Sequence, residues 1–152
     1  MNHILIASIL SMVFAQIVKV PIYYYKKREF KPSMMFSTGS MPSSHTAFVV
    51  TMVIMTGSTE GLNSPIFSIA SIFALITIHD AVKVRGESGK QAKIVNQLVS
   101  DFTGMYEMMN LKTPVERTEK LKELIGHTTA EVFGGLITGI IIALMYISTL
   151  NI

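Results

Sequence analysis

The sequence contains no cysteine and no tryptophan, and few of its residues carry a charge. The absence of cysteine excludes disulfide-stabilised folds, thiolate zinc sites and cysteine nucleophiles. Only 15% of the 152 residues are charged while 49% are hydrophobic, which excludes a disordered, solvated chain. Without tryptophan, an aromatic belt at a membrane interface would be weak. The length predicts a single domain over residues 1–152.

Charge is missing above all from four long runs. No charged residue precedes Lys19, and none follows Glu131. Two more uncharged runs separate Lys31 from Glu60 and Glu60 from Asp80. A helix that crosses a bilayer needs about 20 mostly apolar residues, with a range of roughly 17–25. Buried helices of soluble proteins are also uncharged, but four such runs leave too few polar residues to cover a globule of this size.

The sequence therefore predicts an all-α fold, a polytopic membrane bundle of about four transmembrane helices with amphipathic cytoplasmic helices. The predicted spans cover residues 2–19, 43–59, 63–82 and 127–150. The first run has no basic N-terminal region and no clear small-residue cleavage site, so we interpret it as a retained helix rather than a signal peptide.

The positive charges lie on one side of this arrangement. All 13 Lys and Arg residues belong to the loops 20–42 and 83–126 or to their boundaries. Because cytoplasmic loops are enriched in Lys and Arg, both loops are predicted to be cytoplasmic and both termini to lie outside. The expected location is the cell membrane, with several passes. The net charge of +3 does not indicate nucleic-acid binding, since these charges flank membrane spans.

The second long loop is predicted to contain helices of its own. Apolar residues from Gln91 to Met109 recur at helical spacing among charged ones, which indicates an amphipathic helix on the membrane surface or against the bundle. Another helix is predicted to begin at Thr113, with Pro114 in its first turn, and to end near Gly126.

Polar residues gather at the cytoplasmic ends of the predicted spans, where function usually concentrates. The first group contains Gly39, Ser43, Ser44 and His45. Either serine can cap the next helix, whose free backbone N–H groups suit a phosphate. His45 stands where it can give or take a proton. The alternative is an ordinary capped helix with an incidental histidine.

The second group, at the start of the last span, contains His127 and Glu131. Being four residues apart, they share one face of a helix. A carboxylate beside an imidazole fixes its tautomer and raises its basicity, which suits a nucleophilic or basic histidine. A structural interpretation competes with this one, because Thr128 and Glu131 also match a capping box.

Two further groups carry cations. Asp80 near a membrane boundary needs a partner, which Lys83 or Arg85 can supply, and Arg85 can also clamp phosphate oxygens. Gln16 and Lys19, at the end of the first span, can reach a polar site, although a lysine that snorkels to the interface is the more common explanation.

The predicted topology brings these four groups into one layer. Two histidines, an acid and several cations suit phosphoryl transfer without a metal. Cations would hold the phosphate oxygens, one histidine would attack phosphorus and the other would protonate the leaving oxygen. A metal bound by His45, His127 and Glu131 is less favoured, because the sequence has no local zincin-type cluster. No cofactor is therefore predicted.

Taken together, these motifs resemble those of a known enzyme family. Met41 to His45 resembles the Pro-Ser-Gly-His motif of the type 2 phosphatidic acid phosphatases, relatives of the vanadium haloperoxidases. His127 to Val132 resembles their third motif, a histidine followed four residues later by an acid. The chain is most similar to the divergent branch of that superfamily, whose patterns match Ala15 to Lys19, Gly39 to His45, Asp80 to Ala92 and Gly126 to Val132.

The resemblance implies a role for each matching residue. His127 would be the nucleophile that forms a phosphohistidine, Glu131 would orient it, and His45 would be the general acid. The phosphate-binding residues would be Lys19, Lys26, Ser43, Ser44 and Arg85, supported by Gly39, Asp80 and Gln91.

Several departures from the family pattern bear on activity. Where the family has an arginine six residues before the third-motif histidine, this chain has Leu121, and we expect Arg85 to substitute. Ser40 and Lys83 replace glycines, and four spans are predicted where the standard enzymes have six. A second copy, in a homodimer, is one way to complete such a site. Glycines four apart in the last span, at positions 135 and 139, suit close packing either with that copy or within one bundle.

The predicted function is a membrane phosphatase that hydrolyses a lipid phosphate through phosphohistidine at the cytoplasmic face. The expected partners are the bilayer and a lipid substrate of the phosphatidic acid, phosphatidylglycerophosphate or isoprenoid phosphate class. A cytoplasmic site favours the first two over outer-leaflet isoprenoid diphosphate. The alternatives are a phosphatase for a soluble ester, a weak or inactive lipid-phosphate-binding or scaffold protein, and a small transporter.

Overall fold

The computed structural model describes residues 2–36, 40–109, 121 and 128–150, which are helical and contain no strand. The elements are α1 (His3–Lys27), the short 3₁₀ helix η1 (Pro32–Phe36), α2 (Ser44–Glu60), α3 (Pro65–His79), the π-helical turn η2 (Asp80–Val84), α4 (Arg85–Met108) and α5 (Thr129–Leu150). The all-α class predicted from the sequence is confirmed.

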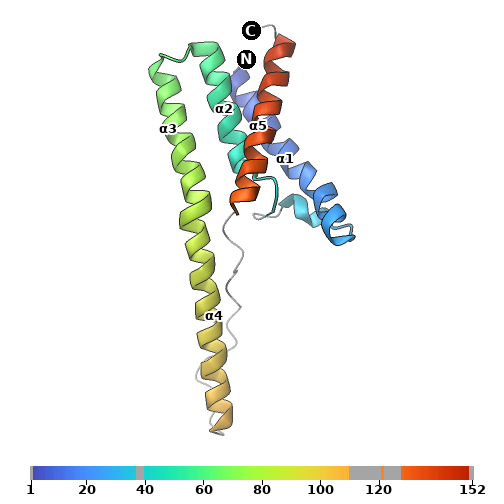
Figure 1. Ribbon diagram of the computed structural model, residues 1–152, viewed down its shortest axis with the longest axis vertical. Coiled ribbons are helices and arrows are strands. Elements are labelled where there is room, and N and C mark those ends of the chain that lie inside the picture. The colour runs from blue at the N-terminus through green and yellow to red at the C-terminus, as the bar shows by residue number, and fades with distance from the viewer. Residues whose placement is uncertain (1, 37–39, 110–120, 122–127, 151–152) are drawn as a thin grey trace.

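The bundle is built around α2. This helix packs against α1, α3 and α5, and α1 also contacts α5. Both chain ends and the turn between α2 and α3 lie at one end of the bundle, while α2 and α5 begin at the other (Figure 1). Two helix starts that are far apart in the sequence therefore meet at the same end.

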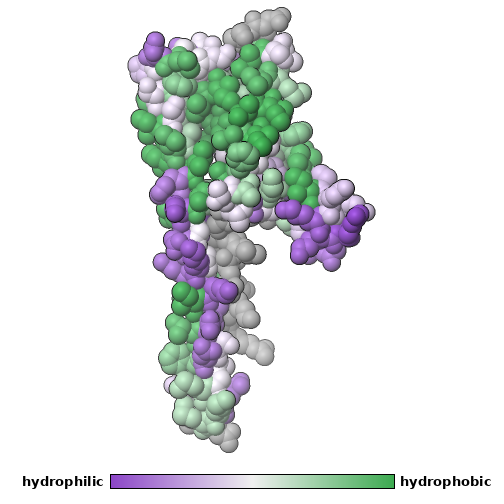
Figure 2. All heavy atoms as spheres, viewed as in Figure 1, coloured by the Kyte–Doolittle hydropathy of each residue, from purple (hydrophilic) through white to green (hydrophobic). Residues whose placement is uncertain are grey.

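Within the described residues, three helices are long and apolar enough to cross a membrane: α1, the continuous helix from α3 through α4, and α5. Hydrophobic side chains cover the bundle, and hydrophilic ones begin at the α3–α4 junction and at the end of α1 (Figure 2). The predicted count of four spans is not confirmed, because α2 has only 17 residues. At 1.5 Å per residue it is about 26 Å long, slightly less than the hydrocarbon core of roughly 30 Å.

The amphipathic helix of the second long loop is present but is not a separate element. The helix α4 continues directly from α3 and η2 and projects beyond the bundle (Figure 1). No proline interrupts the chain there, and the isolated glycines at 86 and 89 each cost only about 1 kcal/mol relative to alanine, which does not end a helix. The apolar face of α4 remains exposed in the described part of the chain, with Phe102 54% accessible. The helix predicted after Thr113 lies outside the described residues.

The first helix is longer than the predicted span. It continues two turns past Lys19 in spite of Pro21, and it ends at Arg28, whose φ of 57° is left-handed and whose N–H donates to the Tyr24 carbonyl. At 25 residues, α1 exceeds the length that a bilayer needs. Its last turns therefore extend beyond the apolar part of the bundle.

Small residues let α5 approach α2 closely. A Cβ atom at Gly135 would lie 2.4 Å from the Ser43 carbonyl oxygen, and one at Gly139 would lie 2.8 Å from that of Ala47. The hydroxyl of Thr51 donates to the Gly139 carbonyl across the same contact, at 3.0 Å. Backbones that approach this closely need glycine, as in many membrane helix pairs. The two glycines thus serve packing within one bundle.

We expect Gly135→Ala to destabilise the protein, because its methyl group would collide with the backbone of α2 rather than with a flexible side chain. Overpacking of this kind costs about 1–3 kcal/mol. Thermal unfolding in detergent would measure the loss. The matched control is Gly104→Ala on α4, where no atom lies within 4 Å of the new Cβ. Equal effects of the two substitutions would contradict the role given to Gly135.

Candidate functional site

The start of α2 is capped by Ser43. Its Oγ accepts from the Thr46 N–H at 3.4 Å and from the Thr46 hydroxyl at 3.0 Å. The predicted capping by one of two serines is therefore confirmed, with Ser43 as the residue. The side chains of Ser43, Ser44 and Thr46 are buried, whereas His45 between them is exposed. The turn thus directs the histidine away from the helix contacts that bury its neighbours.

The start of α5 is held by a reciprocal capping box. The Thr128 N–H donates to Glu131 Oε2 at 3.1 Å, and the Glu131 N–H donates to Thr128 Oγ1 at 3.3 Å. The structural interpretation of this pair is therefore correct. It leaves room for a second role, because the other carboxylate oxygen is not used by the cap.

The two helix starts are joined directly. The Ser43 N–H donates to the Glu131 carbonyl at 2.9 Å. Beside this bond, Met41 occupies the space that a side chain at Gly134 would fill, with its Cε 2.9 Å from the position of the missing Cβ. The serine–histidine motif and the start of the last span are thus packed against each other.

Lys19 is buried at the same end of the bundle. Only 1% of it is accessible, so it does not snorkel to the interface as the common explanation would have it. A buried cation is costly unless an opposite charge compensates it, and the carboxylate of Glu131 attracts it. One turn earlier on α1, Gln16 Oε1 is buried with no hydrogen-bond partner among the described residues.

Among the described residues, three charged side chains lie near enough to His45 to influence it electrostatically. They are Lys19 from α1, Asp80 from η2 and Arg85 from the first turn of α4. Asp80 and Arg85 form an ion pair, with Arg85 Nε donating to Asp80 Oδ2 at 2.7 Å. The partner of Asp80 is thus Arg85 rather than Lys83. We call Lys19, Ser43, Ser44, His45, Asp80, Arg85 and Glu131 the polar cluster.

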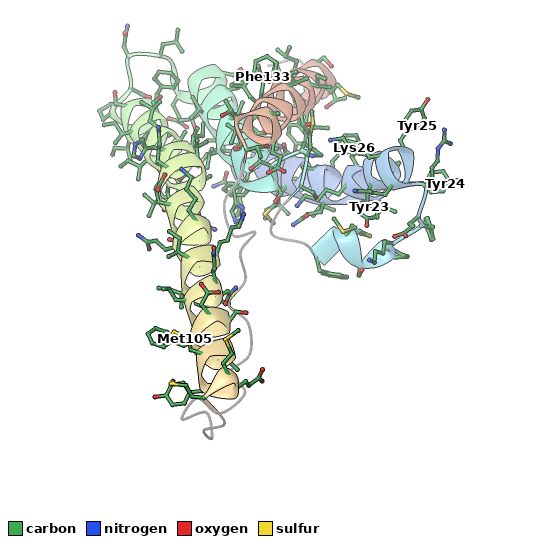
Figure 3. The ribbon with its side chains drawn as sticks, turned by 60° about the horizontal axis from the view of Figure 1, so that its bottom comes forward. Tyr23, Tyr24, Tyr25, Lys26, Met105 and Phe133 are labelled. Atoms are coloured by element: carbon green, nitrogen blue, oxygen red, sulfur yellow. The ribbon has the colours of Figure 1, made fainter. Side chains whose placement is uncertain are left out.

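Two predicted site residues lie away from this cluster, and two others lie outside the described residues. Lys26 lies on the exposed last turns of α1, next to Tyr23, Tyr24 and Tyr25 and away from the start of α5 (Figure 3). Gln91 is exposed on α4, beyond the bundle. Gly39 and His127 lie outside the described residues, although Thr128, the next residue after His127, is held by the carboxylate of Glu131.

Ser40 is a residue whose importance the sequence signalled only weakly. Its φ is 102°, in the region that favours glycine, and its hydroxyl is buried with no partner in the described part of the chain. The glycine of the related branch pattern at this position is explained by that backbone angle. The only signal in the sequence for the positive φ of Ser40 was that this serine replaces a glycine of the branch pattern.

The arrangement combines the features of an anion site. The first turn of α2 and the positive end of its dipole face the same end of the bundle as two cations. Fold and site together define a small helical membrane protein that has a polar cluster of two cations and two acids at one end of its bundle. The cluster contains three residues singled out from the sequence: Arg85 as an ion-pair partner of Asp80, Ser43 as a helix cap, and Lys19.

Comparison with known proteins places the chain in a family. It belongs to the family described as "Divergent PAP2 family", which matches residues 1–142. The resemblance inferred from the motifs is thus confirmed. The chain is also 40% identical over 147 residues to "Uncharacterized membrane protein YuiD" of Bacillus subtilis (strain 168), covering 95% of this chain and 93% of that protein. No solved structure matches it.

We expect inorganic phosphate to stabilise the protein and Lys19→Met to abolish that effect. A ligand present at 100 times its Kd raises the free energy of unfolding by about 2.7 kcal/mol. Methionine fills the buried space of Lys19 without its charge, so the fold should persist while the anion loses a partner. Thermal unfolding with and without phosphate would measure this. Lys31→Met, at an exposed lysine, is the control. Equal stabilisation of Lys19→Met and wild type would exclude Lys19 from the site.

Proposed function

We propose that the protein is a lipid phosphate phosphatase that works through a phosphohistidine on His127. The observation that carries this proposal is the junction of α2 and α5, where the Ser43 N–H bonds the Glu131 carbonyl at 2.9 Å. It packs the two histidine-bearing motifs of the family against each other, beside the buried Lys19. Membership of the Divergent PAP2 family supports the same chemistry.

The proposed reaction has two steps. In the first, a ring nitrogen of His127 forms a bond to phosphorus as the bond from phosphorus to the lipid oxygen breaks. His45 gives its proton to that oxygen. In the second, water attacks the phosphohistidine, His45 takes a proton from the water, and inorganic phosphate leaves with His127 restored.

The other cluster residues would bind the phosphate group. Lys19 and Arg85 would neutralise the charge on its oxygens, and Arg85 would replace the family arginine that is Leu121 here. The hydroxyl of Ser43 already accepts two hydrogen bonds, so its own proton can be donated to an oxygen. Ser44 would contribute from the first turn of α2.

Asp80 and Arg85 of the cluster lie at the α3–α4 junction, where the hydrophobic surface of the bundle gives way to hydrophilic residues (Figure 2). A membrane lipid would present its phosphate at that level while its chains stay in the bilayer. This favours a lipid substrate over a soluble ester. With the basic loops in the cytoplasm, the substrate would be an inner-leaflet lipid such as phosphatidic acid or phosphatidylglycerophosphate.

A second candidate is a protein that binds lipid phosphates without turnover. The observation that favours it is the use of Glu131 in the capping box, which ties one carboxylate oxygen to the Thr128 N–H. If that is the only role of Glu131, His127 lacks an orienting acid. The two candidates differ in whether Glu131 is needed for chemistry or only for folding.

We expect purified protein in detergent to release phosphate from lipid phosphates in the presence of a chelator. His127→Ala should abolish turnover, and His45→Ala should slow it by about 10²–10⁴-fold, the usual contribution of a general acid. Phosphate release over a panel of phosphatidic acid, phosphatidylglycerophosphate and isoprenoid phosphates would measure both effects and rank the substrates.

Glu131→Gln separates the two candidates, since glutamine also closes a capping box. Lost turnover in a variant that still folds would support an orienting carboxylate, even where its unfolding temperature falls because Lys19 loses an attracting charge. Absence of turnover in folded wild type on every lipid would favour the binding protein instead.

The cysteine-free sequence allows the orientation to be tested directly. We expect the single variant Lys31→Cys to react with an impermeant maleimide only after cells are opened. Leu62→Cys, in the exposed turn between α2 and α3, should react on intact cells. The reverse pattern would place the cluster outside and turn the proposed substrate toward outer-leaflet lipids.

A further inference from the structure

The long helix from α3 into α4 contains one wide turn, at the level of the polar cluster. Over η2 the backbone is π-helical, and the Arg85 N–H donates to the Asp80 carbonyl five residues earlier. Single π turns within α-helices are rare and are frequent at functional sites. Here the turn changes which side chains share a face.

In a regular α-helix, residues three and four apart face each other. Asp80 would then face Lys83 and Val84, and Arg85 would point elsewhere. The wide turn adds one residue to the repeat, so Arg85 comes to lie beside Asp80. Their side chains meet at 2.7 Å through Arg85 Nε and Asp80 Oδ2. The π turn thus selects Arg85 over Lys83 as the partner.

The pair lies near the proposed site and remains accessible. Both charges act on His45, and η2 contacts α5. The side chains of Arg85 and Asp80 are 44% and 37% exposed. A ligand that approaches His45 can therefore reach the guanidinium without displacing a buried group.

Which nitrogen of Arg85 is bonded to Asp80 determines which of its other nitrogens can bind a ligand. The guanidinium is a planar fork with five N–H donors. Because Nε–H is engaged by Asp80, the two terminal amino groups of the fork are left for a phosphate, which suits bidentate binding. A lysine has one ammonium group and no such fork, so it could not be oriented in this way.

We propose that Asp80 is a positioning residue: together with the π turn it orients Arg85 to bind the phosphate through its terminal amino groups, without touching the phosphate itself. This inference rests on the proposed function. It also accounts for an acid beside an anion site, since a carboxylate that served no orienting purpose would only repel the phosphate.

A positioning role and a purely repulsive role of Asp80 predict opposite changes in phosphate affinity for Asp80→Asn. If Asp80 only adds negative charge, its removal strengthens phosphate binding. If it orients Arg85, its removal weakens binding although the site becomes more positive. We expect a loss of about tenfold in the Kd, by analogy with metal sites, where loss of a partner that orients a ligand costs about 10–100-fold.

The experiment measures the Kd of inorganic phosphate by titration calorimetry on the detergent-solubilised protein, with phosphate release from lipid measured in parallel. Asp80→Asn and Arg85→Lys should both weaken binding, and Asp80→Glu should recover part of the loss because it keeps a carboxylate. The matched control is Glu87→Gln, which breaks an equally short ion pair to Lys90, 2.7 Å, on the exposed face of the same helix and should leave the Kd unchanged.

Unchanged or tighter binding by Asp80→Asn, in protein whose wild type binds phosphate, would overturn the positioning role and leave the proposed function standing. If Asp80→Asn does not fold, weaker binding by Arg85→Lys supports the inference and unchanged binding overturns it. Wild type that neither binds phosphate nor releases it from lipid would instead overturn the proposed function, and this inference with it.

Discussion

The close contact between α2 and α5 is the constraint on which the rest of the structure depends. At Gly135 the two backbones are so near that a single methyl group would lie 2.4 Å from the Ser43 carbonyl oxygen. This approach allows the Ser43 N–H to bond the Glu131 carbonyl. Because both helices begin at that point, every group attached to their first turns converges there. Separation of the helices would disperse the polar cluster without altering any of its side chains.

The cluster is costly to maintain in a bundle of this size, and its composition reflects how that cost is offset. Lys19 is almost fully buried, and the attraction of Glu131 offsets part of the cost of that burial. The carboxylate of Glu131 also closes the first turn of α5. Two buried polar atoms near the cluster, Gln16 Oε1 and Ser40 Oγ, lack partners among the described residues. Unpaired groups of this kind are unusual in native proteins and call for an explanation. In the proposed complex the Ser40 hydroxyl would donate to a phosphate oxygen, whereas Gln16 Oε1, which can only accept, would need a donor such as water.

Features set by local sequence could be predicted. Charge-free runs located the apolar helices, the serine–histidine motif indicated a capped helix, and Thr128 with Glu131 indicated a capping box. The order of the motifs was sufficient to identify the family, because each pattern is short but four of them recur in sequence.

Features that depend on the third dimension could not be predicted. The continuity of α3 and α4 has no local signal, since periodicity alone does not show where a helix ends when no proline intervenes. No residue type encodes the π turn, so Lys83 and Arg85 looked equivalent as partners of Asp80. The sequence could not show whether the glycines at 135 and 139 pack within one bundle or against a second copy, because that depends on which helix lies beside them. Lys26 matched a family position, yet it lies two turns beyond Lys19 on an exposed part of α1.

The central claim is that the phosphoryl group passes through His127. The most direct test is to react the protein briefly with a radiolabelled lipid phosphate, quench in alkali, which preserves phosphohistidine, and locate the label by peptide mapping. We expect an acid-labile label on the peptide that contains His127, and none in His127→Ala. Phosphate release that proceeds with no labelled protein, or with the label on another residue, would contradict it.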